Sequence, residues 1–273
     1  MGSKAYRDTF RSTGWHYARF RRGYPDAVFE LFRQKFGLDG TGRLLDLGCG
    51  TGQLAMPLAR EFEEVVAMDP EPEMLAEAAA LGRARGIPNV VWREAGSVDL
   101  EDLRPAIGAF RLVTMGNSFH WMDREATLRT LYEMVTPGGG IAVLGSGSDS
   151  TWTPPETPSI MDAVVKRWLG EVRRAGSGTY EHPAERHEVV VARSPFRGLE
   201  IHAVSHGEDW TVDGLVGSLY SSSYASPFVL GANREAFESD LRTRLAALEP
   251  SGSFREEVTH HAILAWRACR PSL

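Results

Sequence analysis

Three glycines and two acids stand at the ends of the first two apolar runs of the chain. The first run ends in a turn that contains Gly48, Gly50 and Gly52, and Asp46 lies two residues before the first of them. Asp69 ends the next apolar run. Glycine adopts positive φ and has no Cβ, so a ligand can contact the backbone of such a turn directly. The pattern predicts a ligand-binding turn rather than an ordinary tight connection between a strand and a helix.

The spacing of the glycines indicates which class of ligand would bind. A dinucleotide-binding turn follows G-x-G-x-x-G, and counted from Gly48 its last position falls on Gln53. A Walker loop needs Gly-Lys-Ser/Thr, and no lysine lies nearby. A carboxylate at the position of Asp69 can accept two hydrogen bonds from a ribose whose hydroxyls are both free. The residues therefore favour a nucleoside without a pyrophosphate.

His120 follows the fourth apolar run, at the edge of the predicted sheet where α/β folds bind ligands. An unperturbed imidazole titrates near pH ~6.5 and can take a proton from a reacting hydroxyl or amine. General base is one interpretation of His120. The other is that His120 and Trp121 form a wall of the ligand pocket, because a reacting carboxylate is already a nucleophile and needs no base.

Short apolar runs that alternate with helical patterns must position these residues. The runs are continuous in hydrophobicity, as expected of strands that helices cover on both faces. The predicted strands are residues 43–47, 65–68, 90–93, 110–115 and 141–144, and the helical patterns between them are residues 53–61, 72–85, 99–103 and 123–135. This alternation predicts an α/β fold with a doubly wound, mostly parallel sheet.

The flanks of this region have their own patterns. Residues 26–36 predict an amphipathic helix that Pro25 can start and Gly37 can end. The stretch 145–158, rich in Gly, Ser, Thr and Pro, predicts a loop at a boundary. Beyond it the patterns predict two helices, at residues 159–174 and 233–248. They also predict two strands, at residues 199–205 and 257–267, which extend the sheet at its far edge.

Composition excludes several classes of protein. A net charge of -6 argues against a broad basic face for nucleic acid, and two cysteines cannot supply a disulfide framework. The first thirty residues lack an apolar signal, and no stretch approaches the ~20 apolar residues that span a bilayer. The eight histidines form no HExxH motif, so no metal site is predicted. We expect a cytoplasmic protein without nucleic-acid or membrane partners, and the sequence leaves its oligomeric state open.

Residues 46–52, DLGCGTG, reproduce the D-x-G-x-G-x-G loop of the class I S-adenosylmethionine-dependent methyltransferases, and the chain resembles this family over about residues 43–144. The resemblance implies S-adenosyl-L-methionine as cofactor and S-adenosyl-L-homocysteine as product. It also implies that the glycine loop lies against the methionine part and that Asp69 holds the ribose. The family often has Gly-Asp-Ala after the third strand, with the Asp near the adenine amine. This chain has Gly96-Ser97-Val98, which leaves Ser97 or Asp99 for that role.

Two flanking segments resemble a narrower group, the small-molecule methyltransferases of the trans-aconitate-methyltransferase type. Residues 110–123, FRLVTMGNSFHWMD, are similar to its FDLV...A-x-H-W-F-D segment. Residues 17–25, YARFRRGYP, are similar to its Y-x-x-x-R-P-x-Y-P segment, with Arg22 in place of proline. This resemblance implies methyl transfer to a small-molecule hydroxyl, carboxylate, amine or activated carbon, in biosynthesis and for instance in secondary metabolism. The alternatives are a cofactor-binding enzyme that cyclises or rearranges its substrate, and a non-catalytic cofactor-binding partner subunit.

These resemblances divide the chain into an N-terminal helical lid at 1–38, a Rossmann-like cofactor-binding core at 39–147, and an acceptor-binding cap with sheet-completing strands at 148–273. His120 is the predicted catalytic residue. The predicted acceptor contacts are Trp121, Tyr220 and Tyr224. The predicted cofactor contacts are Tyr17, Arg21, Asp46, Gly48, Gly50, Gly52, Asp69, Pro70, Met74, Ser97, Val98, Asn117 and Phe119.

Overall fold

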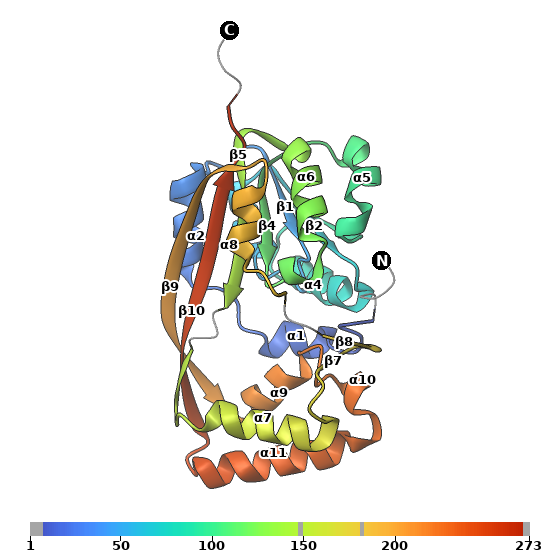
Figure 1. Ribbon diagram of the computed structural model, residues 1–273, viewed down its shortest axis with the longest axis vertical. Coiled ribbons are helices and arrows are strands. Elements are labelled where there is room, and N and C mark those ends of the chain that lie inside the picture. The colour runs from blue at the N-terminus through green and yellow to red at the C-terminus, as the bar shows by residue number, and fades with distance from the viewer. Residues whose placement is uncertain (1–7, 147–149, 181–182, 270–273) are drawn as a thin grey trace.

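A mixed eight-stranded sheet forms the centre of the molecule (Figure 1). The computed structural model describes residues 8–146, 150–180 and 183–269. The sheet has the strand order β3-β2-β1-β4-β5-β10-β6, and β9 pairs with β10 beside this path. Its strands are β1 (Arg43–Leu47), β2 (Glu64–Asp69), β3 (Val90–Glu94), β4 (Phe110–Gly116), β5 (Val135–Ser146), β6 (Thr151–Thr153), β9 (Arg197–Thr211) and β10 (Ser253–Trp266).

The first five strands are parallel, and the order of the chain reverses between β1 and β4. At such a switch point the connections leave in opposite directions and open a crevice beyond the carboxyl ends of the strands. Gly48, Pro70 and Asn117 directly follow β1, β2 and β4. The topology therefore brings the three predicted ligand-binding segments to one edge of the sheet, and the doubly wound α/β fold is confirmed.

Helices cover both faces of the sheet. One apolar cluster joins the sheet to α5, α6 and α8, and a second joins its other face to α2, α3 and α4. The helices of this core are α2 (Asp26–Phe36), α3 (Ala55–Leu58), α4 (Pro72–Ala84), α5 (Leu100–Ile107), α6 (Arg124–Met134) and α8 (His187–Arg193), with the short helices η1 (Ala59–Glu61), η2 (Ser97–Asp99) and η3 (Phe119–Trp121). The predicted helix 26–36 is confirmed at both ends.

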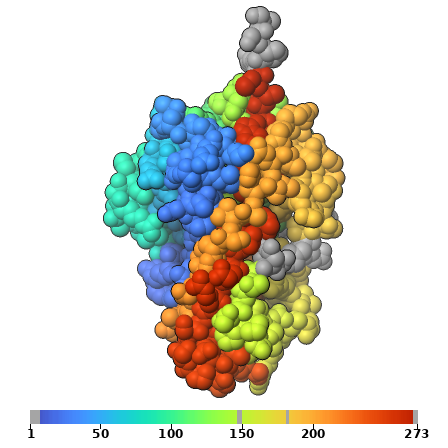
Figure 2. Space-filling view, turned by 90° about the vertical axis from the view of Figure 1, so that its left-hand side faces the viewer, coloured from blue at the N-terminus to red at the C-terminus, as the bar shows by residue number. Residues whose placement is uncertain are grey.

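A separate apolar cluster holds the cap together, and β9 and β10 run from the core into it. Figure 2 shows these two strands as an orange and red band across one face of the molecule. The short helix α1 (Gly14–Phe20) lies between core and cap, against α4 and α9. The remaining cap elements are α7 (Thr157–Leu169), β7 (Arg174–Ala175), β8 (Gly178–Thr179), α9 (Val212–Tyr220), α10 (Pro227–Leu230), η4 (Gly231–Asn233) and α11 (Arg234–Leu248).

Three elements differ from the sequence-based predictions. The predicted strands 199–205 and 257–267 belong to much longer strands, because β9 and β10 hydrogen-bond to each other along almost their whole length. β3 is not covered on both faces: it is the edge strand of the sheet, and Val91 is 47% exposed.

Among the described residues, the helices are too short or too polar to cross a membrane.

Candidate functional site

The glycine turn after β1 has no room for a side chain at Gly48 or Gly52. Gly48, Gly50 and Gly52 all have positive φ, of 73°, 53° and 86°. A Cβ at Gly48 would lie 2.5 Å from the Cβ of Ser118. The backbone N–H of Gly50 donates a 2.8 Å hydrogen bond to Oδ2 of Asp69. The backbone of the turn is therefore exposed to a ligand at its glycines, and a hydrogen bond holds the turn to Asp69 at the end of β2.

Asp69 is a buried carboxyl group that borders a cavity. Its exposed fraction is 9%, and Oδ1 accepts a 2.9 Å hydrogen bond from the backbone N–H of Glu71. Burial raises the pKa of Asp69 to about 6, against the lowering effect of these two backbone hydrogen bonds. Two N–H donors fix the orientation of the carboxylate, and each oxygen keeps a further lone pair that can accept a hydrogen bond from a ligand hydroxyl.

The cavity beside Asp69 has a volume of about 480 Å³. Residues after β1, β2, β3 and β4 line it together with Thr9 and Phe10 from the N-terminal segment. Ser97 and Asp99 both lie on its wall, and Oδ2 of Asp99 accepts a 2.8 Å hydrogen bond from the N–H of Gly96. Both alternatives for the adenine amine thus border the same cavity.

Most of the predicted cofactor contacts line this cavity. They are Tyr17, Gly48, Gly50, Asp69, Pro70, Met74, Ser97, Val98 and Asn117. Four others are placed elsewhere. Gly52 packs under Met56 and Trp92. Phe119 has an exposed fraction of 1% and borders the second cavity described below. Arg21 and Asp46 border a smaller side pocket.

Asp46 holds the scaffold together and does not border the large cavity. Its exposed fraction is 1%. Oδ1 accepts a 2.8 Å hydrogen bond from the Thr114 hydroxyl on β4, and Oδ2 accepts one of 3.1 Å from the N–H of Ala55 at the start of α3. Burial raises the pKa of Asp46 to about 7. In the structure Asp46 links β1 to β4 and α3 through these two hydrogen bonds.

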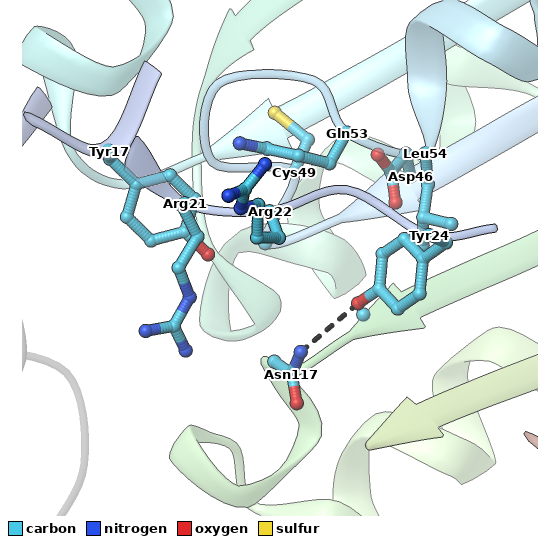
Figure 3. Close-up of a pocket in the computed structure, with 11 residues that line it drawn as sticks. Tyr17, Arg21, Arg22, Tyr24, Asp46, Cys49, Gln53, Leu54 and Asn117 are labelled. Atoms are coloured by element: carbon cyan, nitrogen blue, oxygen red, sulfur yellow. Dashed lines mark hydrogen bonds between the residues drawn. The ribbon is translucent and has the colours of Figure 1, made fainter. Parts of the chain in front are cut away.

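Figure 3 shows the side pocket between the lid segment and the glycine turn. The side-chain amide of Asn117 donates a 3.2 Å hydrogen bond to the hydroxyl of Tyr24 across it. Asn117 has a φ of 52°, a left-handed conformation that asparagine tolerates better than most residues. Arg22 forms a 2.9 Å ion pair with Glu208 on β9. The arginine that replaces a proline of the family motif therefore fastens the lid segment to the long strand.

A second cavity, of about 800 Å³, adjoins the first, and we call it the acceptor cavity. The two share Phe10, Tyr17, Asn117 and Trp121. The acceptor cavity is lined from the cap side by residues that include Tyr180 and Tyr224, and by His120 from η3. His120 thus borders the acceptor cavity, next to the residues at the junction.

Tyr220 does not line the acceptor cavity as predicted. It points into the apolar core of the cap with an exposed fraction of 2%, and its hydroxyl donates a 2.7 Å hydrogen bond to Glu238. The structure instead adds residues that sequence reasoning missed, such as Phe10, Tyr180 and His187. No local motif marks them, because they reach the cavity only through the packing of the lid and the cap.

His187 lies beside His120, with ring centroids 6.4 Å apart and planes 20° apart. Its Nδ1 is 3.1 Å from a guanidinium nitrogen of Arg124. Arginine can only donate, so Nδ1 accepts and the ring proton is on Nε2. Burial, with help from Arg124, lowers the pKa of His187. The imidazole is therefore held neutral at the wall of the acceptor cavity. Within the described ranges, no group of three or more His, Cys, Asp or Glu side chains is arranged to hold a metal ion.

Comparison with known proteins shows similarity to methyltransferases. Residues 44–139 match the family described as a methyltransferase domain. An uncharacterised methyltransferase of Schizosaccharomyces pombe is 30% identical over 146 residues, which cover 52% of this chain and 54% of that protein. Trans-aconitate 2-methyltransferase of Mycobacterium tuberculosis is 33% identical over 132 residues, which cover 47% of this chain and 46% of that protein.

A solved structure shows the same fold over nearly the whole chain. It is a proposed type II methyltransferase from Anaeromyxobacter dehalogenans, with a TM-score of 0.62 and 24% identity. The match covers 92% of this chain and 100% of that one. By sequence, the chain spans about half the length of the two curated relatives given above. The comparisons therefore show the domain and its fold, and the acceptor is a separate question.

Proposed function

We propose, from the premise that residues 44–139 form a class I methyltransferase domain, that this chain transfers a methyl group from S-adenosyl-L-methionine to a small-molecule acceptor. One observation carries the proposal. The cavity between the glycine turn and Asp69 shares wall residues with a second cavity, which His120 borders. A donor site and an acceptor site that adjoin in this way suit a group transfer.

The residues of the 480 Å³ cavity fit the cofactor. When bound, S-adenosyl-L-methionine supplies a methyl group on a sulfonium, which a nucleophile can displace directly. The carboxylate of Asp69 would accept hydrogen bonds from the ribose hydroxyls. The bare turn at Gly48 and Gly50 would contact the methionine part. Ser97 or Asp99 would accept a hydrogen bond from the adenine amine.

The junction residues would orient the acceptor and exclude water. Phe10 and Tyr17 come from the lid, and Asn117 and Trp121 from the connection after β4. A direct displacement needs its nucleophile in line with the bond that breaks, and correct orientation alone lowers the barrier by several kcal/mol. Exclusion of water prevents hydrolysis and strengthens polar contacts in the site. These two tasks need no further catalytic group when the acceptor is a carboxylate.

His120 has a task only if the acceptor must lose a proton. For a hydroxyl or amine acceptor, the imidazole of His120 would take that proton as general base. For a carboxylate acceptor, the ring would pack against the substrate as part of the wall. The two cases differ in their pH dependence, because only the first requires the neutral imidazole for turnover.

Calorimetric titration with S-adenosyl-L-homocysteine tests the cofactor site. Wild-type protein is expected to bind one equivalent, and Asp69→Ala is expected to weaken binding by more than about tenfold, because a buried charge-assisted hydrogen bond is lost. Asp102→Ala, an exposed acid on α5, is the matched control and should bind as the wild type does. Equal affinity of wild type and Asp69→Ala would refute the role of Asp69.

Turnover is tested with methyl-labelled cofactor and a panel of small hydroxy, carboxy and amine metabolites. Methyl transfer predicts a labelled product and one equivalent of S-adenosyl-L-homocysteine for each product formed. Conversion of the substrate without release of S-adenosyl-L-homocysteine would instead support a cyclisation or rearrangement. Cofactor binding without conversion of any acceptor in the panel would support a non-catalytic subunit.

A further inference from the structure

Aromatic rings from three distant parts of the chain form a continuous wall in the acceptor cavity. The ring of Phe10 lies 5.8 Å from that of Trp121, which lies 4.8 Å from Tyr180. His120 lies 5.8 Å from Tyr180 and 4.8 Å from Trp121. The lid, the connection after β4 and the cap each contribute to this ring wall. The planes of neighbouring rings meet at 85° for Phe10 and Trp121 and at 51° for Trp121 and Tyr180, so a planar, apolar ligand can stack on one ring and contact the next one edge to face.

Aliphatic side chains of the sheet complete the lining. Val143 of β5, Ile201 of β9 and Ile263 of β10 all border the acceptor cavity. Ile201 is 52% exposed, although it belongs to a paired strand. Apolar surface left open inside a cavity is stabilised when a ligand covers it, by about 25 cal/mol for each Å² removed from water. The cavity thus favours an acceptor with an apolar body.

The acceptor cavity has more positive than negative side chains whose charge is not paired. Glu185 and Glu188 border the cavity, but each carboxylate is paired with an arginine, Glu185 with Arg193 at 2.6 Å and Glu188 with Arg186. Arg21 and Arg173 also border the cavity. Within the described part of the chain, neither of these two guanidinium groups forms an ion pair.

The guanidinium groups of Arg173 and Arg21 each pack on an aromatic ring instead. The guanidinium of Arg173 lies 4.3 Å from the ring centroid of Tyr224, and that of Arg21 lies 5.5 Å from the ring centroid of Tyr17. Stacking on a ring leaves the edge of a guanidinium, with its N–H donors, available to an anion. The acceptor cavity therefore presents two positive charges that the described carboxylates do not neutralise.

The volume of the acceptor cavity favours a large acceptor over a small one. A volume of about 800 Å³ is in the range of cavities that hold drug-sized ligands. A short aliphatic acid would leave most of the ring wall uncovered. We propose that the acceptor is a planar aromatic carboxylate of at least two fused or conjugated rings, with its rings against the Phe10–Trp121–Tyr180 wall and its anionic group at Arg173. This inference rests on the proposed function and names the substrate class of the same site.

Three probes separate the parts of this proposal in calorimetric titrations of the full chain saturated with S-adenosyl-L-homocysteine. 2-Naphthoate has both rings and the charge, 2-naphthol has the rings without the charge, and tricarballylate has charge without rings. We expect 2-naphthoate to bind at least about tenfold more tightly than either of the others. Equal binding of 2-naphthol would overturn the role of the anion, and equal binding of tricarballylate would overturn the role of the ring wall.

Two variants test whether 2-naphthoate contacts Arg173 and Trp121. Arg173→Gln is expected to weaken 2-naphthoate about five- to tenfold and to leave 2-naphthol unchanged, as for loss of one exposed ion pair with hydrogen bonds. Arg174→Gln is the matched control, because Arg174 follows directly in the chain and does not line the cavity. Trp121→Leu should weaken both ring probes about tenfold or more, since it removes the largest ring of the wall. Equal effects of the two arginine variants would overturn the assignment of Arg173.

The titrations also separate this inference from the proposed function. Wild-type protein that fails to bind S-adenosyl-L-homocysteine contradicts the proposed function itself. Wild-type protein that binds S-adenosyl-L-homocysteine but prefers tricarballylate or 2-naphthol contradicts the aromatic carboxylate alone. Arg173 lines only the acceptor cavity, so Arg173→Gln should keep the wild-type affinity for S-adenosyl-L-homocysteine if it is folded. Trp121 lines both cavities, so the folding of Trp121→Leu is checked by its far-UV circular dichroism spectrum and melting temperature.

Discussion

Replacement of Asp46 separates a scaffold role from a cofactor role. Asp46→Ala would leave the Ala55 N–H and the Thr114 hydroxyl without their present partner. Thr114 is buried completely, so water cannot take over at that position. A buried polar group left unpaired costs about 1–3 kcal/mol. With two such groups, we expect Asp46→Ala to lower the free energy of unfolding by about 2–6 kcal/mol.

Asp46→Asn should behave very differently. The amide oxygen can still accept from the Ala55 N–H, and the amide NH₂ can donate to the Thr114 hydroxyl oxygen. Burial raises the pKa of Asp46 from its ordinary 3.8 to about 7, so folding favours the protonated, neutral carboxyl. Asparagine resembles that neutral form. We expect Asp46→Asn to unfold within about 1 kcal/mol of wild type near pH 4.

The same pKa shift predicts how the difference changes with pH. A raised pKa means that the contribution of Asp46 is complete below pH 3.8 and is lost as the pH rises towards about 7. Asparagine does not titrate. The melting temperature of Asp46→Asn relative to wild type should therefore increase between pH 4 and pH 7.

Thermal unfolding of the ligand-free variants, followed by circular dichroism at several pH values, gives these differences. For a chain of this size a change of 1 kcal/mol shifts the melting temperature by about 2–4 °C. Asp102→Ala again serves as the exposed control. The reasoning is refuted if Asp46→Asn is as unstable as Asp46→Ala, or if its advantage does not grow with pH.

Three further predictions concern the cofactor site and the reaction. Burial raises the pKa of Asp69 to about 6, so affinity for S-adenosyl-L-homocysteine should fall below pH 6, by up to about tenfold per pH unit. An affinity that does not change between pH 5 and pH 8 would contradict the carboxylate contact. Gly48→Ala combines positive φ with a clash against Ser118 and should lower the free energy of unfolding by about 2–4 kcal/mol. Gly86 also has positive φ but lies in open space, so Gly86→Ala should lower it by only about 1 kcal/mol. Similar values for the two variants would argue against a crowded turn. His120→Ala should lower turnover about 10²- to 10⁴-fold for a hydroxyl or amine acceptor, and a loss below about fivefold in steady-state assays would identify His120 as a wall residue.

Local sequence predicts those parts of the site that a single connection forms. The glycine turn and Asp69 follow directly from the residues after β1 and at the end of β2, because parallel strands bring their carboxyl ends to one edge. The helix α2 is predicted at both ends, since Pro25 and Gly37 flank an amphipathic pattern. These features depend on backbone conformation and short-range patterning alone.

Features made by tertiary packing could not be predicted in this way. The hydrogen bond between Asp46 and Thr114 joins two strands that are 68 residues apart in the chain, so the motif around Asp46 does not predict it. Tyr220 and Tyr224 are close in sequence, but Tyr220 ends α9 inside the cap core and Tyr224 lies beyond its end, on the acceptor cavity. Phe10 reaches both cavities because α1, which follows it, packs between core and cap.

A crystal of this protein soaked with S-adenosyl-L-homocysteine tests the central claim most directly. We predict electron density for the adenosine in the cavity between Gly50 and Ser97, with both ribose hydroxyls within hydrogen-bond distance of the Asp69 carboxylate. A parallel soak with NAD⁺ should leave that cavity without the dinucleotide. Density for NAD⁺ with its diphosphate on the glycine turn, or no density for S-adenosyl-L-homocysteine at a saturating concentration, would contradict the account.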